Sequence, residues 1–387
     1  MTEAPSLAAP IAVYVHWPYC ARICPYCDFN VVRDRGRVEE QAALVAAIVA
    51  DLEAQAARIG PRRLVSVFFG GGTPSLMDPD ALGRVIGTAR RLFPTTGEVE
   101  VTLEANPTDA EAARFRAFAD AGVQRLSLGV QSLDDAALTF LGRNHSAAEA
   151  RRAAETARAA FPRLSIDMIY ARPGQTPAAW AAELTDALTM GPEHVSPYQL
   201  TIEPGTAFGR AVGRGAWARP KGDTAADLYD ASQAVLEAAG FEAYEVSNHA
   251  RGEAARSAHN LVIWRGAEYL GVGPGAHGRA VLGGVRTATR AAKAIGDYIA
   301  RVGASGVGWD EAEPLDPVAA AEERLLLGLR IAEGVPLGEI AALGLAAAHP
   351  RVAALVDMGL IDIDARAIRA TPAGRLVLDR VIAELVV

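Results

Sequence analysis

The stretch YVHWPYCARICPYCDF, from Tyr14 to Phe29, contains every cysteine of the 387-residue chain. Cys20, Cys24 and Cys27 follow one another with the spacing C-x3-C-x2-C. Three thiols cannot all pair in disulfides within one chain, and this spacing holds them together in one tight loop. The loop therefore predicts a bound metal ion or metal cluster.

Two kinds of metal site are open to this loop. Zinc takes four nitrogen or sulfur ligands, so His16 is a candidate to complete a site with the three cysteines. However, His16 lies in the alternating apolar run from Ile11 to Trp17, which is typical of a strand, so the sheet fixes its side-chain direction. Iron–sulfur clusters usually take four cysteines, and three would leave one iron open to another ligand. We favour the cluster.

The composition limits the classes of function. Half of the residues are hydrophobic, so the chain can bury a large core and form one large domain with a smaller one. The formal net charge is -8, which predicts no general affinity for nucleic acid. The first ten residues lack a signal-peptide pattern, and no apolar run is long enough to span a bilayer. We expect a cytoplasmic protein, the compartment in which thiols stay reduced.

Six strand-like segments alternate with helical ones in the first half of the chain. This alternation predicts an α/β fold, with a parallel sheet built from βαβ units and curved into a complete or partial barrel. We expect a tail at residues 1–10, the barrel at 11–240, an extension at 241–305 and a C-terminal domain at 306–387. The expected strands are 11–17, 64–69, 98–104, 125–132, 163–170 and 194–200.

Polar or glycine-rich groups follow the ends of the expected strands. They include the GGGTPS loop from Gly70 to Ser75, Glu104 with Asn106, Gln131 and Asp167. Prolines and glycines often stop strands, but that does not explain the repeated carboxylates and carboxamides. Because the carboxyl ends of barrel strands carry the active site, we expect these groups to converge there, beside the cysteine loop.

The cysteine loop and the GGGTPS motif about 45 residues further on resemble the signatures of the radical S-adenosylmethionine (SAM) superfamily. This resemblance implies a partial (β/α)6 barrel and a [4Fe-4S] cluster held by Cys20, Cys24 and Cys27, with SAM chelating the fourth iron. In that chemistry the reduced cluster passes one electron to the sulfonium, and a 5'-deoxyadenosyl radical forms. The resemblance also implies SAM-binding roles for Tyr14, Tyr26, Gly72, Thr73, Glu104, Gln131, Arg143 and Asp167.

The order TLEANP, GVQS, GRNH and IDMIYARPGQT is similar to the branch of oxygen-independent coproporphyrinogen III dehydrogenase. That enzyme carries a fourth cysteine two residues after the third, where this chain has Phe29. The departure favours the related HemW heme chaperones, which lack the decarboxylase activity. We therefore expect a heme carrier without catalytic residues, which donates heme to acceptor hemoproteins such as respiratory enzymes at the cytoplasmic face of the membrane. A homodimer is a further expectation, and the alternatives are the dehydrogenase or another radical SAM enzyme.

The segment SAHNLVIW resembles the H-N-x-x-Y-W stretch associated with heme in this family, with His259 as the candidate axial ligand. Ile263 stands where the family has tyrosine. His249 and His277 are competing candidates, and a buried structural histidine is the alternative for each. The glycines of GVGPGA, Gly271 to Ala276, are expected to line the mouth of the SAM pocket, because no dinucleotide-binding context surrounds them.

The last part of the chain changes character. Residues 318–333 have the pattern of an amphipathic helix, and two short alternating segments near the C-terminus are typical of a winged-helix wing. We expect a small helical domain that packs or docks rather than one that binds DNA. Residues 303–315 are expected to be its linker. In the barrel, Arg172 is expected to be a loop arginine in water.

Overall fold

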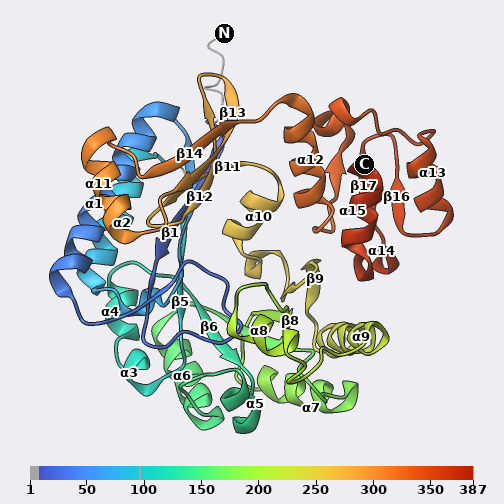
Figure 1. Ribbon diagram of the computed structural model, residues 1–387, viewed down its shortest axis with the longest axis horizontal. Coiled ribbons are helices and arrows are strands. Elements are labelled where there is room, and N and C mark those ends of the chain that lie inside the picture. Colours follow the sequence, from blue (N-terminus) through green and yellow to red (C-terminus); the bar gives the residue numbers. More distant parts are fainter. Residues whose placement is uncertain (1–7, 96, 387) are drawn as a thin grey trace.

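The structure, a computed structural model, describes residues 8–95 and 97–386. Six parallel strands form the centre of one sheet, in the order in which they occur along the chain. Helices connect them and cover their outer face (Figure 1). This arrangement confirms the predicted α/β barrel. The strands are β1 (Pro10–Trp17), β4 (Arg63–Gly71), β5 (Glu100–Ala105), β6 (Arg125–Gln131), β7 (Arg163–Tyr170) and β8 (His194–Gln199).

The barrel is open, because the sheet continues on both sides as twelve strands with two free edges. Beside β8 lie two short antiparallel strands, β10 (Asn248–Ala250) and β9 (Glu242–Glu245). Beside β1 lies β11 (Glu268–Val272), which is parallel to it, and then three antiparallel strands. These three are β12 (His277–Leu282), β13 (Val285–Ala291) and β14 (Trp309–Pro314).

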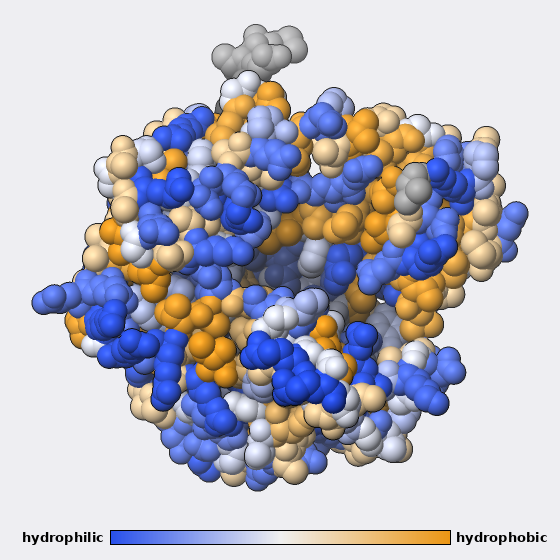
Figure 2. Space-filling model, in the orientation of Figure 1, coloured by the Kyte–Doolittle hydropathy of each residue, from blue (hydrophilic) through white to orange (hydrophobic). Residues whose placement is uncertain are grey.

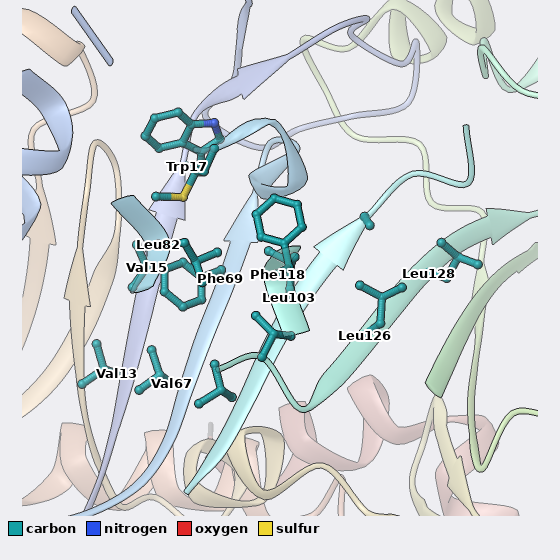
Figure 3. Close-up of a cluster of buried hydrophobic side chains, with 14 of the residues drawn as sticks. Val13, Val15, Trp17, Val67, Phe69, Leu82, Leu103, Phe118, Leu126 and Leu128 are labelled. Carbon is teal, nitrogen blue, oxygen red and sulfur yellow. The ribbon is translucent and has the colours of Figure 1, made fainter. Parts of the chain in front are cut away.

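The alternation of side chains along the strands explains which residues form the hydrophobic core between the sheet and its covering helices. Val13, Val15 and Trp17 of β1 point to one face, where they are buried with residues of β4, β5 and the covering helices (Figure 3). The residues between them, Tyr14 and His16, point to the barrel interior. The outer face is apolar on the other parallel strands too, so burial against helices fixes the register.

Local capping signals set where several helices begin. Asp78 accepts a hydrogen bond from the backbone amide of Ala81 at the start of α2, and Ser146 forms a capping box with Glu149 at the start of α6. Residues 109–120 form two short helices, α3 and α4. The barrel helices are α1 (Val38–Ile59), α2 (Pro79–Leu92), α3 (Asp109–Ala112), α4 (Phe115–Asp120), α5 (Asp135–Phe140), α6 (Ala147–Ala160) and α7 (Pro177–Leu188).

Helix α10 (Ala258–Trp264) contacts β1, β4 and β11. Its first backbone amides, those of Ala258 and His259, donate to the buried carboxylate of Glu100 at 3.1 Å each. Glu100 begins β5, so this helix lies near the amino ends of the strands. Between β8 and β9 the chain forms α8 (Ala207–Gly213) and α9 (Gly222–Ala238).

The C-terminal domain has its own hydrophobic core, which includes Leu325, Val352 and Val381. Residues 303–315, expected to be a linker, are instead the end of α11 (Ile295–Ser305) and strand β14 of the large sheet. The two short segments predicted near the C-terminus pair as an antiparallel hairpin of β16 (Ile361–Ile363) and β17 (Ala367–Ala370). The other elements here are α12 (Pro317–Gly328), β15 (Val335–Pro336), a 3-10 segment (Leu337–Leu343), α13 (Pro350–Asp357), α14 (Pro372–Leu376) and α15 (Leu378–Val386).

No helix in the described ranges has the combination of length and apolar character that a bilayer span requires.

Candidate functional site

A cavity of about 910 Å³ opens at the carboxyl ends of the barrel strands. Its walls come from the cysteine loop, the barrel strands and the C-terminal domain, and Figure 2 shows the molecule hollowed at its centre. The cavity brings together ten of the twelve residues that were predicted to bind a cofactor or metal. The predicted residues that line it are Cys20, Cys24, Cys27, Tyr26, Gly72, Thr73, Glu104, Gln131, Arg143 and Asp167.

The other two predicted residues, Tyr14 and His259, do not line the cavity. The Tyr14 hydroxyl is 3.1 Å from Nδ1 of His16, and its ring stacks on Phe68. His259 is 3% exposed, its Nδ1 is 3.0 Å from the Ser66 hydroxyl, and its ring also stacks on Phe68. Both rings therefore belong to the packed barrel interior.

The three cysteines are free thiols on one wall of the cavity. Burial raises the pKa of Cys20 to about 11 and also raises that of Cys27. These thiols are therefore protonated at neutral pH, and binding of a metal centre would displace their protons. Within the described residues, no three His, Cys, Asp or Glu side chains are gathered closely enough for a single metal ion. A cluster fits this wall better, because it presents a separate iron to each thiolate.

The zinc alternative needed His16 as a fourth ligand. Its Nε2 is 2.8 Å from the backbone oxygen of Asn30, and its Nδ1 is the atom that contacts the Tyr14 hydroxyl. Both ring nitrogens therefore already have hydrogen-bond partners, and the side chain points into the barrel interior. The geometry gives no support to zinc.

A chain of polar contacts joins the glycine-rich loop to the cysteine loop. The Asn106 amide donates to Thr73 Oγ1 at 3.1 Å, and its oxygen accepts from the Arg143 guanidinium. Arg143 also donates to the backbone oxygen of Gly129 at 3.0 Å and lies 3.5 Å from Cys24 Sγ. Arg143 is therefore held at the cavity wall, although its Nε is buried without a partner. That orphaned donor suits an anionic group of a ligand.

Gln131 combines two unusual features. Its φ is 64°, at an irregularity where the register between β6 and β7 shifts, and its Oε1 is buried without a partner. A left-handed conformation in a residue other than glycine costs free energy, of order 1–3 kcal/mol. Because strain of this kind clusters at binding sites, the orphaned oxygen is a second position where a ligand donor fits.

Two carboxylates line the cavity, Glu104 on β5 and Asp167 on β7. Burial, and then the nearby Asp167, raise the pKa of Glu104 to about 8. Burial also raises the pKa of Asp167, although the hydroxyls of Ser196 and Ser127 oppose the shift. A cationic or hydroxyl-bearing ligand would add positive charge or further hydrogen-bond donors beside these buried carboxylates.

The glycine-rich loop approaches the cysteine loop through bare backbone. The amide of Gly72 donates to the oxygen of Trp17 at 2.7 Å, and the amide of Thr73 donates to the oxygen of Tyr19 at 2.8 Å. A Cβ atom on Gly72 would lie 2.7 Å from both of those oxygens. Glycine is required here because of this close approach.

Sequence reasoning missed several residues of the site. It named Asn106 only as a strand-end group, whereas the structure makes it the link between Thr73 and Arg143. It expected the glycines of GVGPGA at the cavity mouth, but they do not line the cavity. Arg172, expected in water, is 7% exposed and pairs with Glu183. The C-terminal lining has no motif, and its members are Arg330, Arg375, Leu376, Val377, Leu378, Asp379 and Arg380.

Comparisons with known proteins agree with this geometry. Residues 14–187 match the model of the radical SAM superfamily, and residues 315–377 match that of the HemN C-terminal domain. The chain is 40% identical over 400 residues to the bovine (Bos taurus) mitochondrial radical S-adenosyl methionine domain-containing protein 1, which covers 99% of this chain and 90% of that protein. It is 35% identical over 386 residues to the heme chaperone HemW of Mycobacterium tuberculosis (strain H37Rv), with 99% and 96% coverage.

A third relative is the heme chaperone HemW of Escherichia coli, at 38% identity over 271 residues and 70% of each chain. Among solved structures, coproporphyrinogen III oxidase (HemN) from Escherichia coli matches with a TM-score of 0.80. That match covers 98% of this chain and 90% of the other at 22% identity, so it shows a shared fold.

Proposed function

The chain belongs to the radical SAM superfamily and, within it, to the family of the HemW heme chaperones, and from this membership we propose that it binds a SAM-ligated [4Fe-4S] cluster and heme and passes heme to acceptor hemoproteins. The observation that carries the proposal is the cavity wall in which three free thiols lie beside Arg143 and the buried carboxylates of Glu104 and Asp167.

In this proposal the chain's own residues hold and orient SAM. Arg143 binds the methionyl carboxylate, while Glu104 and Asp167 accept hydrogen bonds from the amino group or the ribose hydroxyls. The backbone at Gly72 and Thr73 approaches the methionyl part, and Tyr26 shields the cluster from water. Gln131 supplies a further hydrogen-bond acceptor for SAM. Tyr14, which lies in the barrel interior, keeps its predicted role in SAM binding. When bound and reduced, the cluster can supply one electron to the SAM sulfonium.

We propose a carrier rather than an enzyme. Asp28 and Phe29 follow Cys27, so the chain lacks the fourth cysteine that the dehydrogenase carries. Heme iron takes a histidine, for which the sequence offers His259, His249 and His277. The acceptors are hemoproteins, and the expected compartment is the cytoplasm, with a homodimer as the expected assembly.

The first experiment tests the cluster. Protein purified without oxygen and reconstituted with iron and sulfide should contain about four irons per chain, and Cys27→Ala should lose most of them. Asp28→Ala is the matched control, because its side chain lies in the same loop but is not a ligand. Zinc or no metal in the wild type, or full iron in Cys27→Ala, would overturn the proposed cluster.

The second experiment separates the carrier from the dehydrogenase. The reconstituted protein is incubated with coproporphyrinogen III, SAM and dithionite, and in parallel it is titrated with hemin. A carrier binds hemin and gives no decarboxylated porphyrinogen. Decarboxylated product would establish the enzyme instead, and absence of hemin binding would remove the carrier function.

A further inference from the structure

Two residues other than glycine have a positive φ in the described part of the chain, Gln131 at 64° and Ala171 at 62°. Gln131 is the last residue of β6, and Ala171 directly follows the last residue of β7. Both positions therefore lie at the carboxyl ends of neighbouring strands, where the cavity opens. A left-handed conformation is unfavourable for a residue with a Cβ atom, so the surrounding structure must hold each of them.

The conformation of Gln131 belongs to a bulge in β6. Leu128 lies beside Ile166 of β7, whereas Gln131 lies beside Met168. β6 therefore advances three residues where β7 advances two, so β6 contains one extra residue. Bulges interrupt the pairing of strands locally and re-aim a side chain. Without a tie to a neighbouring element, the end of β6 could return to a regular and less strained register.

The carboxylate of Glu183, on α7, contacts the residues that follow both strained positions. It accepts a hydrogen bond from the hydroxyl of Ser132, which directly follows Gln131. It also pairs with Arg172, which directly follows Ala171, and the Arg172 guanidinium donates to the same Ser132 hydroxyl. Glu183 thus ties the two loops to each other and to α7. We call the side chains of Glu183, Ser132 and Arg172 the Glu183 clamp.

The Glu183 clamp is shielded from solvent. The side chains of Arg172 and Glu183 are 8% and 11% exposed, and Ser132 has no exposed surface. The backbone amide of Leu133 also donates to the Glu183 carboxylate, at 2.9 Å. When one partner of a buried ion pair is removed, the other charge is left uncompensated, which is strongly unfavourable. The clamp can therefore hold both loops in strained conformations.

Gln131 connects the clamp to the cavity. Its side chain lines the cavity, and its buried Oε1 has no partner among the described residues. A Cβ atom on Gly129 would lie 3.0 Å from Nε2 of Gln131 and 3.4 Å from the guanidinium of Arg143, so both side chains lie against bare backbone. The described residues that line the cavity include none of the three clamp side chains. The clamp can act on a ligand only through residues such as Gln131.

We propose that Glu183 is a positioning residue for SAM binding: through the Glu183 clamp it holds Gln131 in its left-handed conformation and so directs the Gln131 side-chain oxygen to the ligand. The inference rests on the proposed function, in which Gln131 accepts a hydrogen bond from SAM. It deepens that function by assigning a role to a buried ion pair that does not touch the ligand.

The test is a cycle of variants in the reconstituted protein, with SAM binding followed by calorimetric titration. Gln131→Ala should weaken SAM binding about 2–10-fold, because one hydrogen bond is lost. Glu183→Gln keeps the size of the side chain but removes its charge, and it should weaken binding by no more than Gln131→Ala does. The double variant should bind SAM as Gln131→Ala does, because Glu183 acts through Gln131. Losses that multiply in the double variant would overturn the proposal.

Glu268→Gln is the matched control for a general loss of stability. The Glu268 side chain is 10% exposed, lies 2.7 Å from Arg62 and accepts from the backbone amide of Val281 at 2.7 Å. It begins β11 beside Ile11 of β1, so it lies near the amino ends of the strands, away from the cavity. Denaturant unfolding should show a loss of stability in both Glu variants. Glu268→Gln should bind SAM as the wild type does, and a loss equal to that of Glu183→Gln would contradict the positioning role.

Amide hydrogen exchange tests the clamp without SAM. In Glu183→Gln the amide of Leu133 should exchange at least about tenfold faster than in Glu268→Gln, because the loop after β6 opens locally. Arg172→Gln removes the partner charge and should have the same effect. Unchanged exchange in both clamp variants would show that the ion pair does not hold this loop.

The outcomes separate the clamp from the proposed function. If the reconstituted wild type does not bind SAM, the proposed function falls and the positioning role falls with it, while the exchange data still report on the clamp. If the wild type binds SAM and Glu183→Gln binds it with the same affinity, only the positioning role of Glu183 falls.

Discussion

Arg330 of the C-terminal domain lies 2.6 Å from the carboxylate of Glu245, a side chain with no exposed surface. The other carboxylate oxygen accepts from the backbone amide of Ser247 at 2.8 Å and from the Asn248 amide at 2.7 Å. The pair joins the domain to strand β9, beside the cavity.

Removal of Arg330 should destabilise the protein. Breaking a buried ion pair costs about 3–5 kcal/mol, but Arg330 is 29% exposed and Glu245 keeps two other donors, so we expect about 2 kcal/mol for Arg330→Ala. Arg380→Ala is the control, because that side chain is 77% exposed and pairs with Glu384, four residues away on the same helix. Denaturant unfolding measures both variants, and equal midpoints would contradict the prediction.

Asp51 should make stability depend on pH. Burial raises its pKa from 3.8 to about 6, although Gln55 and the hydroxyl of Tyr298 donate to it. The folded state thus binds the proton more tightly than the unfolded state. The contribution of protonated Asp51 to the free energy of unfolding is therefore complete below pH 4 and is lost as the pH rises to about 6. At about 1.4 kcal/mol per pKa unit, the loss is roughly 3 kcal/mol.

Asp51→Asn cannot ionise and should remove this contribution. The measurement is the free energy of unfolding of both proteins between pH 4 and pH 7. The difference between them should change in favour of the variant as the pH rises, while the contributions of other groups cancel. Parallel curves would show that Asp51 does not titrate in this range.

Gly72→Ala should damage both the fold and the site. The new Cβ would lie 2.7 Å from two backbone oxygens that cannot move independently, so we expect a loss of about 1–3 kcal/mol and weaker SAM binding. Gly87→Ala is the matched control, because it lies inside α2 with nothing within 4 Å. It should stabilise the protein by about 0.5–1 kcal/mol. Thermal unfolding and SAM titration compare the two variants.

Arg143→Gln should weaken SAM binding. A hydrogen bond to a charged group contributes about 1.5–3 kcal/mol, which corresponds to about 10–100-fold in affinity. Arg22→Gln is the control, because Arg22 lines the same cavity but is exposed. Calorimetric titration of the reconstituted protein with SAM checks both, and equal affinities would remove Arg143 from the proposed site.

The six barrel strands could be predicted because their signals are local. Each is an apolar run that ends in glycine, proline or a polar group, and the parallel arrangement then brings Glu104, Gln131 and Asp167 to the same edge of the sheet. Their roles in SAM binding stay predictions. The C-terminal lining around Arg375 was not predictable, because it depends on how two separate cores meet.

The sequence predictions that were wrong failed for a related reason, because they depend on contacts between separate elements of the chain. Strand β14 reads as an acidic linker, but its charges face solvent at the edge of the sheet and its backbone pairs with β13. Arg172 is buried because Glu183, eleven residues further on, returns to it from α7. The burial of His259 also depends on distant residues, since Ser66 and Phe68 come from β4.

The pairing of β1 with β11 sets the order of events during synthesis. Val13 lies beside Leu270, so one wall of the barrel cannot close until the ribosome has translated residues far beyond the cysteine loop. At roughly 5–20 residues per second, that delay is on the order of 10–50 s. During this interval the three thiols of the cysteine loop belong to a chain whose barrel wall is still incomplete.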